Sequence, residues 1–133
     1  MDSIRLGRSG LQVSRLCLGT MTFGAQADEA TSRSMLDAAA DAGVNFIDTA
    51  INYRCQKAER TIGAVLRTLI NDPGEPLARD EIFVSTKAGY VPEDSDIGRP
   101  AAVLLEDLKN EGVIEDSDVA AGIHCMHPGF LEH

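Results

Sequence analysis

The spacing of hydrophobic residues alternates between short apolar runs and longer stretches of helical periodicity. The apolar runs lie at residues 15–20, 44–47 and 81–87. They are too short for helices and rich in β-branched, aromatic or leucine side chains, so they predict buried strands. Apolar residues recur at helical spacing within 28–43 and 58–69. The chain is therefore predicted to follow the order β, α, β, α, β.

Local signals define the ends of these elements. Two alternating runs, 4–6 and 11–13, flank the glycine-bounded turn 7–10 and predict a small hairpin before the first buried strand. Asp28 is a suitable N-cap for the first helix, and Gly43 lies where a glycine ends one. The second helix follows Tyr53, and one of its faces carries Ala58, Ile62, Val65, Leu66 and Leu69.

Strands that are apolar on both faces and alternate with amphipathic helices predict a parallel sheet covered by helices. Two α/β architectures have this order, the doubly wound sheet and the (β/α)8 barrel. A doubly wound dinucleotide fold usually places Gly-x-Gly-x-x-Gly after its first strand, whereas residues 19–24 read Gly-Thr-Met-Thr-Phe-Gly. The barrel is therefore favoured.

Candidate chemistry gathers where the second and third buried strands end. Asp48 closes the second run, Tyr53 follows five residues later, and Lys87 closes the third. Strand alternation places Asp48 on the face of Phe46, opposite Ile47. Taken singly, the three polar residues could be a loop cap, a packing tyrosine and a solvated strand end. In a barrel, however, Asp48 and Lys87 would both project at the C-terminal face, where active sites of this fold lie.

Three segments together resemble the aldo-keto reductase superfamily in order and spacing. They are Gly-Thr-Met at 19–21, Phe-Ile-Asp-Thr-Ala at 46–50 continuing to Asn-Tyr at 52–53, and Ser-Thr-Lys at 85–87. The resemblance covers most of residues 3–90. It implies a (β/α)8 barrel that transfers a hydride between NADP(H) and a small carbonyl or alcohol substrate.

The resemblance also implies roles for individual residues. Tyr53 would protonate the carbonyl oxygen, Lys87 would make the phenol a stronger acid, and Asp48 would pair with Lys87. These residue types suit those roles, because a nearby ammonium group favours phenolate and a carboxylate keeps the ammonium charged and oriented. The cofactor-binding residues implied are Gly19, Thr20, Met21 and Asp48.

The chain departs from the family in length. A full barrel takes about 250 residues, and this sequence has 133. We therefore expect residues 1–133 to be the N-terminal part of a single barrel domain: the hairpin and about three βα units, with an insertion loop at 90–118. That loop has a possible short helix at 100–109. His124 and His127 precede the position of the family's strand-four histidine, and neither is assigned to it.

The sequence gives little support for a metal site or for disulfide bonds. His124, Cys125 and His127 lack the usual ligand spacing, so no metal site is predicted. His127 and Pro128 instead resemble the start of a helix. The three cysteines, including Cys55 beside Tyr53, are an odd number without paired spacing, which suits reduced thiols.

Charge and hydropathy narrow the function classes. The net charge of −9 argues against nucleic acid or an anionic membrane as partner. The sequence has neither a signal-like apolar segment at its start nor a run of about 18 apolar residues, so a cytoplasmic protein is expected. Two functions stay open: the N-terminal part of a reductase, expected to be inactive as this fragment, or a non-catalytic truncated product or interaction module. Substrate identity and oligomeric state are undetermined by the sequence.

Overall fold

The computed structural model describes residues 1–74 and 77–132. The chain forms two compact units, Met1–Thr86 and Lys87–His133. We describe each unit by itself.

The first unit begins with the predicted hairpin. Strands β1 (Ser3–Arg5) and β2 (Gln12–Ser14) are antiparallel, with Ile4 opposite Val13. The hairpin is bonded to the residue just before Phe46, where the middle strand of the parallel sheet begins: the Ser14 amide donates to Asn45 Oδ1 at 2.7 Å and the Asn45 amide donates to Ser14 Oγ at 3.1 Å. This part of the sequence prediction is confirmed.

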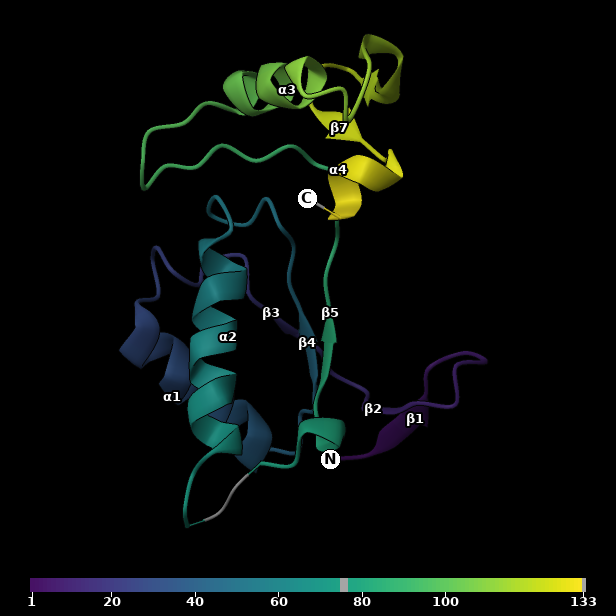
Figure 1. Cartoon of the computed structure of the whole chain (residues 1–133). Helices are drawn as coiled ribbons and strands as arrows, with labels where there is room; N and C mark the ends of the chain where they lie inside the picture. The colour runs from purple at the N-terminus through teal and green to yellow at the C-terminus, as the bar shows by residue number, and fades with distance from the viewer. Residues whose placement is uncertain (75–76, 133) are drawn as a thin grey trace. The chain divides into compact units, whose positions relative to one another are not determined.

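A three-stranded parallel sheet forms the centre of the first unit, in the order β3-β4-β5. Its strands are β3 (Leu18–Gly19), β4 (Phe46–Asp48) and β5 (Phe83–Ser85), with the 3-10 helix η1 (Arg79–Glu81) leading into β5. Helices α1 (Glu29–Asp41) and α2 (Lys57–Ile70) lie on one side of this sheet (Figure 1). The arrangement is a partial (β/α)8 barrel, as predicted. The strands are shorter than the predicted apolar runs.

The core of the first unit lies between the sheet and its helices. Helix α2 contributes the apolar face predicted for it, with Ala58, Ile62, Val65 and Leu66 all buried. Helix α1 begins at the predicted cap, where the Thr31 amide donates to Asp28 Oδ1 at 2.8 Å. It ends before Gly43, whose φ of 80° favours a residue without a Cβ.

The second unit has its own small core. Its elements are α3 (Ala101–Asn110), the 3-10 helix η2 (Asp116–Asp118), strands β6 (Val119–Ala120) and β7 (His124–Cys125), and α4 (Pro128–Glu132). The short helix and the helix starting at Pro128 are confirmed. Within the segment 90–118, expected to be an insertion loop, α3 and several side chains are packed. The buried residues of this core are Val91, Leu105, Leu108, Ile114, Cys125 and Phe130.

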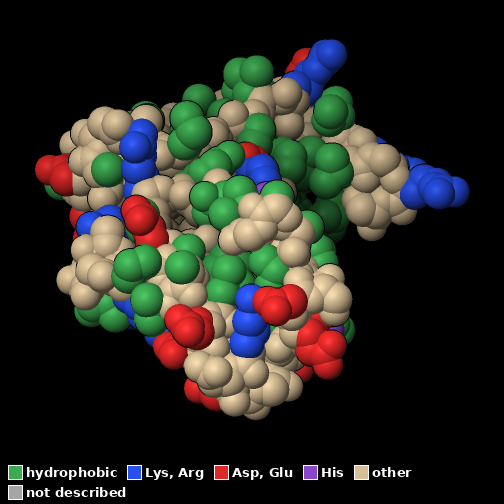
Figure 2. All heavy atoms as spheres, turned by 90° about the horizontal axis from the view of Figure 1, so that it is seen from above, with side chains coloured by type: hydrophobic (Ala, Val, Ile, Leu, Met, Phe, Trp, Pro, Cys, Tyr) green, Lys and Arg blue, Asp and Glu red, His purple; other side chains and the backbone are tan. Residues whose placement is uncertain are grey.

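The surface carries single apolar side chains among scattered charges. Figure 2 shows hydrophobic groups exposed between acidic and basic ones on the face toward the viewer. The most exposed large hydrophobic residues are Ile97, Met126, Leu16 and Met21. Across the described residues, no helix combines the length and the apolar character that crossing a membrane requires.

Candidate active site

The C-terminal ends of the three parallel strands lie in one row. Gly19 of β3 pairs with Asp48 of β4, and Asp48 pairs with Ser85 of β5. The next residue after β3 and the next after β4 also bond across the sheet: the Thr20 amide donates to Asp48 O at 3.1 Å, and the Thr49 amide donates to Ser85 O at 2.8 Å. The register therefore brings the ends of all three strands together, two of which carry predicted site residues.

Asp48 lies on the sheet face opposite the helices. Ile47 is 1% exposed and belongs to the core beneath α1 and α2, whereas Phe46 and Asp48 are half-buried. Because side chains alternate along a strand, Phe46 and Asp48 share the other face. The predicted orientation of Asp48 is confirmed.

Tyr53 lies in the turn between β4 and α2. Its amide donates to Ala50 O at 3.0 Å, and its carbonyl oxygen accepts from the Ala58 amide at 3.3 Å. The side chain is half-buried and packs against the core of the first unit. Tyr53 therefore has one side held by packing, and its backbone is fixed at both ends of the turn.

The predicted cofactor-binding residues surround the end of β3. Thr20 is fully buried, and its hydroxyl donates to Asp48 O at 2.9 Å. Gly19 is exposed, and a Cβ placed there would meet no heavy atom within 4 Å. Met21 is 58% exposed. Thr20 thus supports the strand end from within, while Gly19 leaves room for a planar group to approach the backbone.

Lys87 lies two residues beyond Ser85 of β5 and is the first residue of the second unit. Its side chain is exposed. The structure therefore brings Gly19, Thr20 and Asp48 together and places Tyr53 in the turn after β4. The convergence of the Lys87 side chain with these residues stays a prediction.

Two contacts near the site were not foreseen from the sequence. Thr86, at the end of β5, donates its hydroxyl hydrogen bond to the Glu59 carboxylate in the first turn of α2. Arg54, directly after Tyr53, donates from Nε to the Met21 carbonyl oxygen at 3.0 Å. The only signal in the sequence was that two of these residues, Arg54 and Glu59, are charged and follow Tyr53 closely. Neither partner could be identified from spacing alone.

A hollow of about 210 Å³ lies on the helix side of the strands, bounded partly by Thr49, Glu59 and Thr86. Its apolar walls come from α2 and β5, through Leu66 and Val84 among others. Asp48 faces the other side of the sheet. This hollow therefore does not open onto the candidate catalytic carboxylate.

His124 and His127, in the second unit, have structural contacts. The His124 ring meets the Tyr90 ring edge to face, with ring centres 5.4 Å apart. His127 Nδ1 accepts a hydrogen bond from the Gly129 amide at 3.2 Å. Within residues 1–74 and 77–132, His, Cys, Asp and Glu side chains do not cluster in threes suited to holding a metal ion.

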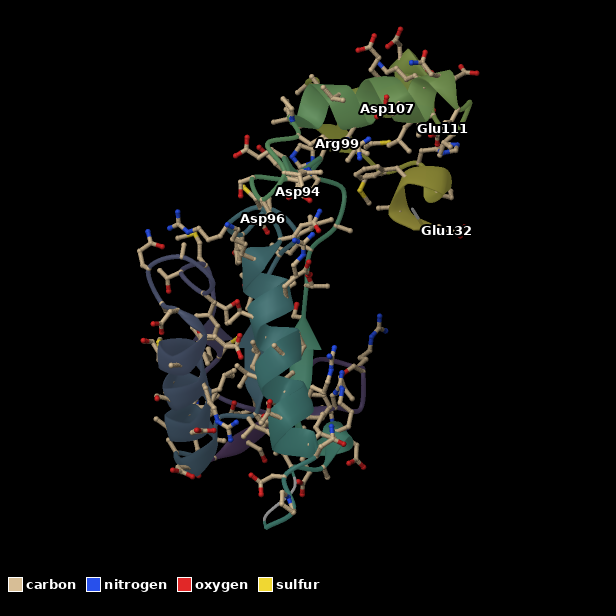
Figure 3. All side chains as sticks on the ribbon, turned by 60° about the vertical axis from the view of Figure 1, so that its left-hand side comes forward. Asp94, Asp96, Arg99, Asp107, Glu111 and Glu132 are labelled. Atoms are coloured by element: carbon tan, nitrogen blue, oxygen red, sulfur yellow. The ribbon has the colours of Figure 1, made fainter. Side chains whose placement is uncertain are left out.

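Acidic side chains are frequent in the second unit, and a basic one is placed among them. Figure 3 shows Arg99 beside Asp107, with Asp94 and Asp96 on the neighbouring turn. The Arg99 guanidinium forms an ion pair with Asp107 at 2.5 Å. Residues 93–95 and 98–100 line a surface hollow of about 300 Å³. The ion pair balances part of the local negative charge.

Comparison with known proteins gives consistent matches. The sequence model of the Aldo/keto reductase family matches residues 15–118. The "Probable voltage-gated potassium channel subunit beta" of Oryza sativa subsp. japonica is 37% identical over 132 residues, covering 96% of this chain and 38% of the relative. Norsolorinic acid reductase of Aspergillus flavus is 42% identical over 86 residues, covering 59% of this chain and 20% of the relative.

A solved structure shows the same fold. The holo form of an aldo-keto reductase from Bacillus halodurans has a TM-score of 0.58 and 28% sequence identity, covering 85% of this chain and 35% of that chain. The chain spans less than half the length of these matched proteins.

Proposed function

Because the chain belongs to the aldo/keto reductase family of oxidoreductases, we propose that it is the N-terminal part of an NADP(H)-dependent enzyme that reduces small aldehydes or ketones to alcohols. The observation that carries this proposal is the row formed by Gly19, Asp48 and Ser85 at the C-terminal ends of the three parallel strands. Active sites of barrel enzymes are built at this end of the strands. The catalytic residues proposed are Asp48, Tyr53 and Lys87.

The residues at the end of β3 fit a nicotinamide cofactor. Gly19 has open space where a Cβ would point, so a flat ring can approach the backbone closely. Thr20 is buried and holds Asp48 O, which leaves the exposed surface at this strand end to Gly19 and Met21. Bound NADPH supplies the hydride, and no side chain performs that step.

The protein's own residues would manage the proton. Tyr53 would donate its phenolic proton to the carbonyl oxygen as negative charge develops there. The Lys87 ammonium would stabilise the resulting phenolate, and the Asp48 carboxylate would keep the lysine charged and oriented. The packing of Tyr53 against the core supports this role, because a proton donor must be held in position.

A fusion protein tests the proposal. Residues 1–133 would replace the matching N-terminal part of the Bacillus halodurans reductase, which would supply the rest of the barrel. NADPH oxidation with a panel of aldehydes is expected, and Tyr53→Phe is expected to lower kcat by at least about a hundredfold, the lower range for a general acid. A folded fusion protein whose turnover is unaffected by Tyr53→Phe would refute the assignment of the proton donor.

A second function is favoured by one comparison and one structural feature. The Oryza sativa relative is named as a channel subunit beta. Among the described strands, β3 and β5 each pair on one side only within the parallel sheet, and unpaired edges can bind another chain. A non-catalytic subunit would bind a partner protein, and Tyr53→Phe would leave that binding unchanged.

A further inference from the structure

The loop after β3 is ordered but leaves Met21 exposed. The Phe23 amide donates to Thr20 O at 3.0 Å, and the Ala27 amide donates to Thr22 O at 3.1 Å. Phe23 is fully buried in the core of the first unit. Phe23 therefore anchors the loop, while Met21 and Thr22 before it are exposed beside the candidate cofactor site.

The loop after β4 has an unusual backbone. Arg54, Cys55 and Gln56 have φ values of 51°, 55° and 69°, so three successive residues with side chains adopt the left-handed region. Residues other than glycine rarely adopt this conformation, and it persists where surrounding contacts impose it. The run begins directly after Tyr53, so whatever holds it also fixes the position of the tyrosine.

Two contacts join these loops. Arg54 Nε donates to the Met21 carbonyl oxygen at 3.0 Å. Gly24 lies against the start of α2 so closely that an added Cβ would be 2.7 Å from Lys57 Cβ. The hydrogen bond from the guanidinium is charge-assisted, which makes it stronger than a hydrogen bond between two neutral groups. Arg54 itself is half-buried, and its bond to the Met21 carbonyl oxygen lies at an exposed position.

We propose that Arg54 is a positioning residue that fixes the loop carrying Tyr53 to the loop carrying Met21. The importance of this clamp for reduction rests on the proposed function, because that function makes Tyr53 the proton donor and Met21 a cofactor contact. The clamp itself concerns only the two loops. Arg54 acts through the Met21 carbonyl, and it is not itself assigned a contact with substrate or cofactor.

Amide hydrogen exchange on the purified chain tests the proposal without cofactor or substrate. Arg54→Met keeps most of the apolar stem but removes the donor, whereas Arg54→Lys keeps a charged donor. In Arg54→Met, the amides of Phe23, Ala27 and Tyr53 are expected to exchange about tenfold faster. Arg54→Lys is expected to retain most of the protection. Arg67→Met, at an exposed position late in α2, is the matched control and should change none of them.

The amides of Phe83 and Thr49, which donate across the parallel sheet to Asn45 O and Ser85 O at 2.8 Å, report general loosening of the first unit. A tenfold change confined to the loops, with recovery in Arg54→Lys, supports the clamp. Unchanged loop exchange in Arg54→Met, or an equal increase at Phe83 and Thr49, overturns it. Arg54→Gln provides a second variant if Arg54→Met does not stay folded, and the same local pattern is expected.

The experiment separates the two proposals. If Arg54→Met loses loop protection but the fusion protein has no reductase activity, the clamp is supported and the proposed enzyme function is rejected. An active fusion whose Arg54→Met variant keeps full loop protection would retain the enzyme and reject the clamp.

Discussion

Thr20 donates two hydrogen bonds to the carbonyl oxygen of Asp48, from its amide at 3.1 Å and from its hydroxyl at 2.9 Å. The Thr20 side chain is fully buried and Asp48 is half-buried, so the two bonds are partly shielded from water. They lie just beyond the last paired residues of β3 and β4. The pair therefore fixes the point at which the Asp48 side chain leaves the sheet and reaches the candidate active site.

Thr20→Val is expected to lower the free energy of unfolding by about 1 kcal/mol, because it removes one part-buried hydrogen bond while nearly preserving the side-chain shape. Urea unfolding followed by circular dichroism measures the change. Thr20→Ser keeps the hydroxyl but removes a methyl group, so it separates bonding from packing. A smaller loss in Thr20→Val than in Thr20→Ser would show that packing, and not the hydroxyl bond, stabilises this position.

Gly24→Ala is expected to destabilise the first unit by roughly 1–3 kcal/mol through overpacking. The new Cβ would lie 2.7 Å from Lys57 Cβ and 2.9 Å from the Lys57 carbonyl oxygen, and the backbone oxygen cannot move aside freely. Gly10→Ala is the matched control, since Gly10 also has a positive φ, 83°, but open space around its Cβ position. Equal losses of unfolding free energy in both variants would mean that backbone conformation, and not the clash, sets the cost.

Asp28 is expected to make the stability of α1 depend on pH. The backbone hydrogen bond from Thr31 lowers the pKa of Asp28 below its ordinary value of 3.8. A group whose pKa is lower in the folded state stabilises that state fully above its unfolded pKa. The contribution is lost as the pH falls through the lower folded pKa.

Unfolding curves at a series of acidic pH values check this prediction. Asp28→Asn keeps a capping oxygen without a titrating charge, so its stability should change less with pH than that of the wild type below about pH 4. Identical pH dependence in the two proteins would show that the Asp28 carboxylate does not contribute.

The features predicted correctly from the sequence are those set by local patterns. The Asp28 cap, the glycine after α1 and the apolar face of α2 each depend on residues a few positions apart. The orientation of Asp48 follows from strand alternation alone. The parallel sheet followed from the order of strands and helices, since parallel strands require covering helices. The barrel was then favoured over the doubly wound sheet because residues 19–24 lack the Gly-x-Gly-x-x-Gly pattern.

The features that were missed depend on contacts between distant segments or on unusual backbone. Arg54 and Met21 are 33 residues apart, and no spacing rule pairs a side chain with a distant carbonyl. The β6 and β7 hairpin turns through Ala121 and Gly122, at φ values of 51° and 70°, and Ala121 stands where Asn or Gly is the usual signal. The left-handed run at 54–56 carries no glycine to indicate it.

A protein consisting only of residues 1–133 is expected to show no appreciable reductase turnover. These residues cover 35% of the Bacillus halodurans reductase, so most of a closed barrel must come from elsewhere. Among the described strands, β3 and β5 pair on one side only in the parallel sheet, which leaves two edges able to aggregate. Folded proteins are stabilised by only about 5–15 kcal/mol, so an incomplete shared core leaves little margin.

Cofactor affinity gives a second, independent reason for this expectation. Association costs roughly 4 kcal/mol or more, and the cofactor contacts proposed within the chain are few: Gly19, Thr20, Met21 and Asp48. Fluorescence titration with NADPH and an assay against a panel of aldehydes test both reasons on the purified chain. Saturable micromolar binding, with turnover abolished by Tyr53→Phe, would show that these residues assemble a working site without the remaining barrel strands. Size-exclusion chromatography in the same buffer would then reveal whether association of several chains supplies the missing contacts.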